Sequence, residues 1–538
     1  MTRLHAITEH NRKWWTLGAM CFALFMIMLD NTVVNVALPS IQRSLGASLS
    51  GLEWTVNAYT MTFAVLLVTG GRLGDIFGRR LAFLVGVVLF ALSSATAGLA
   101  PNATSLVASR AVQGVGAALM MPATLSIITN AFPAHERGKA IGTWAGVSAL
   151  ALAIGPVVGG FLTEHVSWRA IFFLNLPVAA AAVIVTLAAA RESRDHGVPR
   201  AVDYGGVATL TAGIGALVLA LIEGNRWGWT STPIIALFLV SVIGIVAFNF
   251  VELRSRNPMI EYRFFGSRTF LSTNGIAFCV SFAMLAMFFF MALYMQNILR
   301  YSPLEAGIRF LPSTIVIMIA APIAGRLTDR IGAKLPIVFG LSLATVALYL
   351  QSQITVHTGY GHLLPTFIIM GLGMGFVMSP MSTAAMNAVD AAKAGGASGI
   401  LSMSRMVGGT FGVAAVGAVF QSLADSKLHS KLADVPLTSS QKSWFVDNLG
   451  SGAINARLHQ LPPSTAHQVD QAVRETFISS LGSSMRLSAA VAATGVVIAI
   501  IGIERVRQRR PEAVPAIAKD IGQAAPAQPQ LPAEPVRQ

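Results

Sequence analysis

Three charged side chains stand inside long segments that are otherwise apolar: Asp30, Arg110 and Arg405. A charge at the centre of a lipid bilayer costs about 2.5 to 3.5 kcal/mol on insertion scales, so it persists where it is paired, hydrated or functional. A carboxyl group in such a place can take up and release a proton. A guanidinium keeps its proton at any relevant pH, so it can only tune a neighbouring acid or order water. These residue types point to proton exchange across a membrane rather than to covalent catalysis.

Asp30 and Arg110 are expected at the same depth. Asp30 lies about eight residues from the far end of the first apolar segment, and Arg110 about six residues inside the matching end of the fourth. Because a helix rises 1.5 Å per residue, both would lie roughly 10 Å below the membrane surface. This favours a proton-coupling pair, although a hydrogen-bonded structural carboxyl would show the same pattern. Arg405 has no acid at its depth in its own half, so it is either a donor to backbone carbonyls or part of a cavity.

Polar residues near these charges are candidates for the wall of a substrate cavity. They are Asn31, Asn35 and Gln113, together with Arg405. A few polar groups in a mostly apolar wall are typical of sites that hold small molecules.

The composition requires a membrane to position these residues. Hydrophobic residues make up 54% of the 538 and charged residues only 12%, whereas soluble domains have about one quarter charged residues. Apolar runs long enough to cross a bilayer recur along nearly the whole chain. The sequence predicts fourteen spans, at 15–38, 54–71, 81–100, 105–129, 141–163, 170–190, 204–223, 232–251, 269–295, 304–325, 335–354, 363–386, 396–421 and 485–504.

The distribution of Lys and Arg predicts the orientation. They are concentrated in the short loops on the side of the N-terminus, and cytoplasmic loops are the ones that retain positive charge. An even number of spans then places both termini in the cytoplasm. The net charge of +14 is explained by this asymmetry, so it does not indicate a nucleic-acid partner.

An internal repeat divides the chain. The segment GRLGDIFGRR at 71–80 is echoed by GRLTDRIGAK at 325–334, with five identical positions at an offset of 254. Eight predicted spans separate the two copies, so the halves are spans 1–6 and 9–14, with spans 7 and 8 inserted. Two related bundles that face each other are how many transporters build a central cavity with alternating access. The expected divisions are residues 1–195, 196–262, 263–505 with a long external loop at 422–484, and 506–538.

The repeated segment carries candidate gating residues. Glycines and arginines at a tight turn allow two helices to approach, and Asp75 can accept hydrogen bonds from Arg72 or Arg79 and face a helix N-terminus. The arginines alone would also serve as an insertion signal, but the duplicated acid Asp329 favours a conformational latch. The residues of this predicted gate are Gly71, Arg72, Asp75, Gly78, Arg79, Arg80 and Asp329.

Several motifs occur in an order that resembles one family, the fourteen-helix drug/proton antiporters of the major facilitator superfamily, often called the EmrB/QacA type. The motifs are LDNTVVNVALP at 29–39, the segment at 71–80, SRAVQGVGAAL at 109–119, AIGPVVGG at 153–160, SWRAIFFLNLP at 167–177 and GASGILSMSRMVGGTFG at 396–412. The resemblance implies an all-α polytopic membrane protein with the major facilitator fold, that is, two six-helix bundles plus two inserted helices.

The resemblance also implies a function. It predicts a secondary exporter in the bacterial inner membrane that expels small amphipathic or cationic compounds as protons enter. The motif at 153–160 would then be the antiporter motif of the family, in which Gly155, Pro156, Gly159 and Gly160 permit close helix packing. The alternative is that these residues only pack two helices together and have no special role in antiport. A dedicated exporter of one metabolite, antibiotic or siderophore remains open, as does a receptor or scaffold that keeps the fold.

The remaining features are less specific. The loop at 422–484 contains a predicted amphipathic helix at 469–481 and could cap the exit, bind a periplasmic adaptor or be a passive hairpin. The segment 506–538 is rich in Pro, Ala and Gln and predicts a disordered tail. No cofactor-binding signature, catalytic constellation or metal-ligand spacing is recognised, so we expect no enzyme activity, cofactor or metal site.

Overall fold

The computed structural model describes residues 8–9, 11–46, 49–194, 201–255, 258–433, 435–447, 449 and 453–504. Within these residues the elements are helices, without any strand. The predicted disordered tail at 506–538 lies outside the described residues.

Fourteen stretches of these helices are long and apolar enough to cross a membrane, which confirms the predicted number. The spanning helices are α1 (Arg12–Leu45), α2 (Leu49–Phe77), α3 (Arg79–Gly98), α4 (Ala103–Ala131), α5 (Arg137–His165), α6 (Ala170–Phe173) joined with α7 (Asn175–Ala189), α8 (Tyr204–Trp227), α9 (Thr232–Arg254), α11 (Arg268–Asn297), α12 (Pro303–Ile331), α13 (Lys334–Gln351), α14 (Tyr360–Asn387), α15 (Ala394–Lys431) and α18 (Pro463–Gly502). The short helices are η1 (Ala134–Glu136), α10 (Arg263–Gly266), η2 (Ala391–Lys393), α16 (Ser439–Asp447) and α17 (Ala453–Leu458).

Large apolar side chains point outward from the bundle. Leu92, Ile243, Ile319 and Phe339 are all more than half exposed. A water-soluble protein rarely exposes so much contiguous apolar surface, but a lipid bilayer solvates it. The outer surface therefore fits a protein that is surrounded by lipid.

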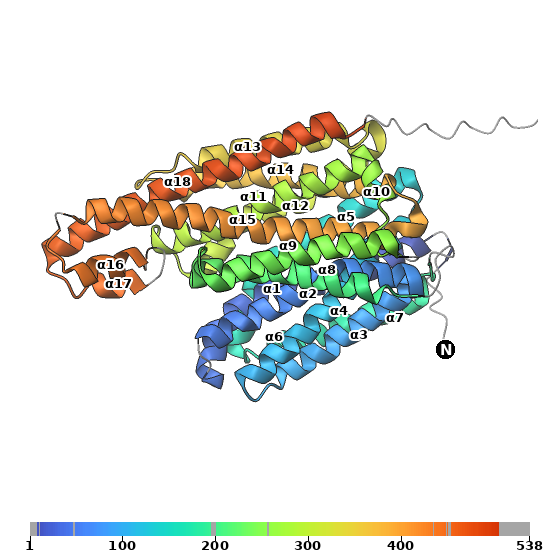
Figure 1. The fold of residues 1–538 in the computed structure, drawn as a ribbon, viewed down its shortest axis with the longest axis horizontal. Coiled ribbons are helices and arrows are strands. Elements are labelled where there is room, and N and C mark those ends of the chain that lie inside the picture. Colours follow the sequence, from blue (N-terminus) through green and yellow to red (C-terminus); the bar gives the residue numbers. More distant parts are fainter. Residues whose placement is uncertain are drawn as a thin grey trace, which may run out of the picture.

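The spanning helices form two bundles, α1 to α7 and α11 to α18 (Figure 1). The bundles meet where α5 packs against α12 and α2 packs against α15. Helix α1 begins at the same end of the molecule at which α18 finishes. We call this end the N-terminal face and the opposite end the far face.

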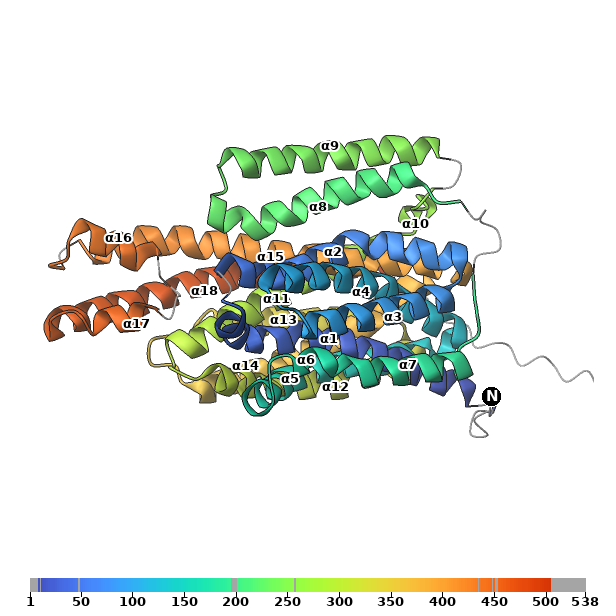
Figure 2. The same cartoon turned by 90° about the horizontal axis from the view of Figure 1, so that it is seen from below.

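The inserted helices α8 and α9 pack against each other as a hairpin at the edge of the molecule (Figure 2). Of the two, α8 makes the contacts with the bundles, through α2 and α15. The hairpin therefore touches both bundles beside one of their two joints.

The last two spanning helices extend beyond the predicted boundaries. Helix α15 has 38 residues and α18 has 40, which at 1.5 Å per residue is about twice the 30 Å hydrocarbon thickness. The predicted amphipathic helix at 469–481 is confirmed as part of α18. Residues 422–431, at the start of the predicted external segment 422–484, continue α15 as a helix. The projecting parts pack against each other: Lys431 of α15 pairs with Glu475 of α18, and apolar side chains of both parts, such as Leu428 and Val473, are buried.

Candidate functional site

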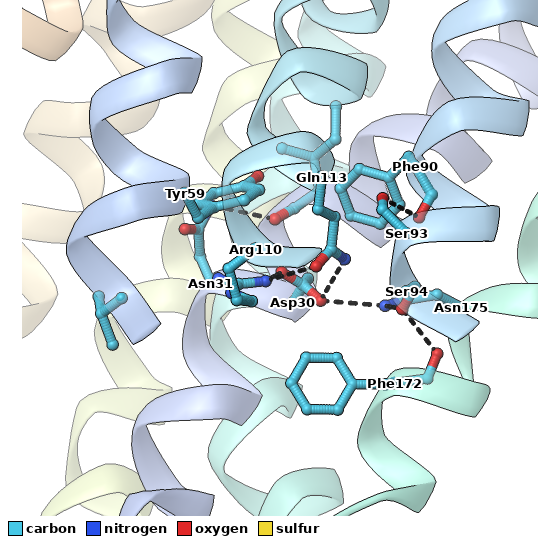
Figure 3. A network of polar contacts seen from close by, with 12 residues as sticks. Asp30, Asn31, Tyr59, Phe90, Ser93, Ser94, Arg110, Gln113, Phe172 and Asn175 are labelled. Carbon is cyan, nitrogen blue, oxygen red and sulfur yellow. Dashed lines mark hydrogen bonds and ion pairs between the residues drawn. The ribbon is translucent and has the colours of Figure 1, made fainter. Parts of the chain in front are cut away.

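Asp30 is the centre of a buried polar network in the N-terminal bundle (Figure 3). Its Oδ2 forms an ion pair with Nη1 of Arg110, and the side chains of the two residues are each 1% exposed. Its Oδ1 accepts hydrogen bonds from Nε2 of Gln113 and Nδ2 of Asn175, both at 3.0 Å. The predicted partners Asp30 and Arg110 therefore do lie together, one on α1 and the other on α4.

Arg110 is held by other groups as well. Its Nε donates to the carbonyl of Thr55 at 3.1 Å, and its Nη1 donates to Oε1 of Gln113 at 2.8 Å. Its guanidinium carbon lies 4.3 Å from the ring centroid of Tyr59, which is a cation–π contact. Because Asp30 accepts from three side chains, a proton on its carboxyl group would compete with a donor, so protonation requires the network to rearrange.

Asn175 is a member of this network that the sequence did not single out. It is the first residue of α7, just after the break that separates α6 from α7. Its Nδ2 also donates to Oγ of Ser94 at 3.0 Å, and that hydroxyl donates to the carbonyl of Phe172 at 2.8 Å. The sequence feature that could have identified Asn175 is that it is a polar amide within the mostly apolar segment 167–177.

A second site lies at the N-terminal face, where Asp75 joins the two bundles. Its Oδ1 accepts from the backbone N–H of Gly395 at 2.9 Å, and its Oδ2 accepts from that of Gly396 at 2.7 Å. These N–H groups open helix α15, whose N-terminus favours a negative charge. Arg79 donates to Oδ1 of Asp75 from Nε at 2.9 Å and from Nη2 at 2.7 Å.

Asp329 makes the equivalent contact in the opposite direction. It lies near the end of α12, and it accepts from the backbone N–H groups of Gly138 at 2.9 Å and Lys139 at 3.0 Å, at the start of α5. Each bundle thus places one carboxylate on the first turn of a helix in the other bundle. We call these two contacts the Asp75 latch and the Asp329 latch.

Glycines allow the backbones to meet at both latches. A Cβ on Gly395 would collide with the carbonyl of Gly71, and a Cβ on Gly138 would collide with the carbonyl of Gly325. Gly78 also meets a structural requirement, because its φ is +121°, a value that L side chains rarely adopt.

The repeat reaches further than the predicted gate. Gly332, the copy of Gly78, also has a positive φ of +86°. Gly138 and Gly395 stand at an offset of 257, close to the 254 of the carboxylates. The sequence reasoning missed this second pair, because the offset of 254 aligns Gly138 with Ala392 and not with Gly395.

Two predicted gate residues lie elsewhere. Among the described residues, the side chain that bonds to Asp75 is Arg79 and not Arg72. Arg80 binds within its own bundle, where its Nη2 donates to the carbonyl of Leu187 at 3.1 Å. Of the arginines in 71–80, Arg79 therefore takes part in the Asp75 latch, whereas Arg80 bonds within its own bundle.

The sequence profile of the Major Facilitator Superfamily matches residues 20–413, which contain both latches and the Asp30 network. The protein belongs to the major facilitator superfamily. Its members are carriers that move small molecules across membranes, and the fourteen spans agree with the fourteen-helix type.

Curated relatives cover most of the chain. The chain is 32% identical over 514 residues to the tetracenomycin C resistance and export protein of Streptomyces glaucescens, covering 95% of this chain and 96% of the relative. It is 37% identical over 418 residues to the multidrug resistance protein Stp of Mycobacterium tuberculosis, covering 78% of each. It is 31% identical over 504 residues to the multidrug transporter protein MdtP of Bacillus subtilis, covering 92% of each.

Solved structures share the fold. The human organic anion transporter MFSD10 superposes with a TM-score of 0.60 at 12% identity, covering 90% of this chain and 99% of that one. The proton:xylose symporter XylE superposes with a TM-score of 0.57 at 13% identity, covering 91% and 95%. At this identity the likeness shows the major facilitator fold alone.

In this facilitator, the glycines of α5 serve two different interfaces. A Cβ on Gly142 would lie 2.7 Å from the carbonyl oxygen of Ala321 on α12, so this part of α5 meets the other bundle. Gly155 and Gly159 instead face α1 in the same bundle, against Thr32 and Val33. The predicted motif at 153–160 is thus a close contact between α1 and α5. The side chain of Pro156 lies outside the described part of the structure.

We expect Gly159→Leu to damage transport and Gly160→Leu to be tolerated. A Cβ on Gly159 meets the Cα, Cγ1 and carbonyl oxygen of Val33 at 3.1 Å each, whereas on Gly160 it meets only Cγ1 of Val36 at 4.0 Å. Overpacking of a tight contact typically costs about 1 to 3 kcal/mol. Thermal stability and transport of the two variants check this, and equal effects of both would show that the spacing of α1 and α5 is not tight.

The predicted cavity residues are dispersed. Gln113 is fully buried and its amide is occupied by Asp30 and Arg110, so it belongs to the charge network. The side-chain amides of Asn31 and Asn35 donate to carbonyls of their own helix, of Ile27 and Asn31 respectively.

Arg405 is half-buried on α15, and its Nη2 donates to Oγ of Ser382. Its Nε is buried without a hydrogen-bond partner among the described residues. Ser398, two helical turns earlier, bonds to the carbonyl of Pro122 in the other bundle at 2.8 Å. Residues seven apart share a helix face, so Arg405 lies on the same face of α15 as Ser398, although its own hydrogen bond is to Ser382 of α14 in the same bundle.

Proposed function

We propose that this protein is a secondary exporter that couples proton entry to the efflux of small amphipathic or cationic compounds. The observation that carries the proposal is the buried pair of Asp30 and Arg110, within a chain whose relatives carry the names of drug resistance and export proteins. An acid in the membrane that is paired with a cation and bonded to amides from two further positions is a site at which protonation can drive a rearrangement.

The orientation follows the positive charge. The N-terminal face is assigned to the cytoplasm of a bacterial cell and the far face to the outside of its inner membrane. On this assignment both latches close the cytoplasmic side. The division into residues 1–195, 196–262, 263–505 and 506–538 is retained as part of the proposal, with the first and third as the moving bundles.

The proposed transport cycle uses the Asp30 network first and the two latches second. A proton that enters from outside neutralises Asp30 and frees its donors, which changes the packing of α1 against α4 and α7. The bundles then rock and the latches open, so that Asp30 and the substrate cavity become accessible from the cytoplasm. The proton leaves to the cytoplasm and the substrate binds from it. Export follows when the latches close behind the substrate.

The seam between the bundles is assigned as the substrate cavity, with Asn31, Asn35 and Arg405 in its wall. Arg405 carries a charge without an acidic partner among the described residues, so it should discriminate between substrates of different charge. We expect Arg405→Ala to change the order of preference among compounds rather than to abolish transport of all of them. Resistance profiles of the variant and the wild type check this, and a uniform loss across compounds would instead indicate a structural role.

A dedicated exporter of one compound is the second candidate, favoured by the relative named for tetracenomycin C, which matches over 95% of this chain. The two candidate functions differ in the number of unrelated compounds that the protein would export. The wild type expressed in an efflux-deficient host would confer resistance to several unrelated compounds in one case and to one compound in the other.

Reconstitution in proteoliposomes tests the coupling itself. With a pH gradient imposed, we expect movement of a cationic dye such as ethidium against its gradient, and proton flux that begins when the dye is added. Binding without movement would point to a receptor or scaffold, and movement without proton flux would remove the antiport mechanism.

The helical extension formed by the ends of α15 and α18 with α16 and α17 projects from the far face (Figure 1). We assign it as the contact for a periplasmic adaptor. Crosslinking in whole cells from exposed positions of α16 tests this assignment, and a lack of protein adducts there would leave the extension as a cap on the exit.

A further inference from the structure

Two carboxylates meet where the inserted hairpin reaches the N-terminal face. Asp203 stands just before α8 and accepts from the backbone N–H of Gly206 through Oδ1 at 2.8 Å. Glu252 stands near the end of α9, is 2% exposed, and accepts from the backbone N–H of Ile260 through Oε1. Their other oxygens, Oδ2 and Oε2, are buried and have no hydrogen-bond partner among the described residues.

These two oxygens flank the same point. A Cβ placed on Gly206 would lie 3.2 Å from Oδ2 of Asp203 and 3.1 Å from Oε2 of Glu252. The two oxygens are therefore no more than about 6 Å apart, a range in which one carboxylate disfavours ionisation of the other, and such pairs commonly hold one proton between them.

Helix α2 contributes two more polar groups. Thr69 and Arg72 are 9% and 6% exposed, and together with Asp203 they line a cavity of about 10 Å³. The hydroxyl of Thr69 is also buried without a partner among the described residues. The rest of the cavity wall is apolar, formed by Leu73, Ile76, Val202, Val207 and Met259. The cavity has room for one water molecule, which could bond to these three polar side chains. The cluster thus offers a built site for a water molecule beside a pair of acids.

The charges around the site leave one negative charge uncompensated. Among the described residues, the cation that faces Asp203 and Glu252 is Arg72 of α2. The other titratable group near Glu252 in the described part of the chain is Tyr262, whose phenol donates instead to Oδ1 of Asn249 at 2.8 Å. One added proton would therefore make the cluster neutral.

The site is connected to the Asp75 latch. Glu252 holds the backbone at Ile260, and the next residue, Glu261, forms an ion pair with Lys393 at 2.6 Å, just before α15. A Cβ on Gly396 would lie 4.0 Å from the carbonyl oxygen of Met259 and 3.6 Å from Oδ2 of Asp75. Movement of Glu252 would therefore be transmitted to the first turn of α15.

We propose that Asp203 and Glu252 share one proton next to a water molecule bound by Thr69 and Arg72, and that loss of this proton loosens the Asp75 latch. The proton passes to and from cytoplasmic water, and no other bond forms or breaks. With the proton present, only one of the two acids is charged and they do not repel each other. Without it, the two anions repel and Glu252 pulls away from Ile260. The site is a cytoplasmic pH sensor that is separate from Asp30.

The first test is the titration of the pair, which does not depend on the proposed transport function. Infrared difference spectra of the purified protein follow protonated carboxyl groups as pH is raised. We expect one component of the wild-type step to be missing from both Glu252→Gln and Asp203→Asn, because a shared proton needs both acids. Glu223→Gln is the matched control, since Glu223 is buried on the same hairpin at its far end and pairs with Arg226 at 3.5 Å. A step of full wild-type size in either of these two variants, or an equal loss in Glu223→Gln, would overturn the proposal.

The second test is the link to the latch. Leu81 and Leu335, 49% and 52% exposed, start α3 and α13 in opposite bundles and can carry spin labels through Cys, with Cys21 and Cys279 replaced by Ala. We expect the distance between labels to lengthen at alkaline pH in the wild type and in Glu223→Gln, and to stay short in Glu252→Gln and Asp203→Asn. A pH-dependent distance in either of those two variants, or a constant one in the wild type, would show that the pair does not control the latch.

Discussion

Replacing Asp30 with Asn is expected to abolish efflux driven by a pH gradient while substrate binding remains. The amide keeps the shape of the carboxyl group but cannot exchange a proton. It also leaves Arg110, which is 1% exposed, without its counter-charge, and breaking a buried ion pair in this way typically costs about 3 to 5 kcal/mol. Downhill exchange of substrate should survive, because it needs no proton. Dye transport with and without a pH gradient, alongside dye binding, measures both effects.

A double variant separates the loss of coupling from the loss of stability. Asp30→Asn combined with Arg110→Gln removes both charges, so the unpaired cation is gone and much of the stability should return. We expect the double variant to remain uncoupled although it is stable. Recovery of proton-driven accumulation with recovered stability would show that Asp30 is structural, and the carrier would then be sought among Glu53, Glu164 and Glu223 near the membrane edges.

Some features of the Asp30 network could be read from the sequence and others could not. The depth of Asp30 and Arg110 is set by helical rise within an apolar segment, so their proximity could be predicted. Whether Gln113 faces a cavity or the pair depends on the rotation of α4, which hydropathy does not fix. The position of the Asn175 side chain depends on where the sixth span is interrupted between α6 and α7, and the sequence indicates that position only weakly.

Hydropathy also could not predict where the long helices α15 and α18 end. A hydropathy window detects the part of α15 that lipid surrounds, but the continuation to Lys431 packs against α18, where Leu428 is buried and Lys431 pairs with Glu475. Such packing is tertiary, so a local pattern cannot reveal it. The repeat at an offset of 254, in contrast, encodes a relation between distant segments, and for this reason it located both latch carboxylates.

Removing either latch carboxylate is expected to open the cytoplasmic face. In Asp75→Asn or Asp329→Asn, the side-chain carbonyl can accept one backbone N–H, but the NH₂ group then points at the other donor. Hydrogen bonds to charged groups contribute about 1.5 to 3 kcal/mol each, and about 1.4 kcal/mol changes an equilibrium tenfold. We therefore expect at least a roughly tenfold shift towards the open form and slower transport, with insertion unchanged because topology depends on Lys and Arg.

Labels at Leu81 and Leu335 measure this opening, and Asp390→Asn provides a matched control. Asp390 lies at the same face and also accepts from a backbone N–H, that of Ala392 at 3.0 Å, but within its own bundle. The control should leave the distance unchanged. The double variant of Asp75 and Asp329 should open further than either single variant, because the two contacts lie at different joints of the bundles and their free energies should add. Unaltered transport in Asp75→Asn would remove it from the mechanism, and impaired transport at an unchanged distance would assign it a role other than closing the gate.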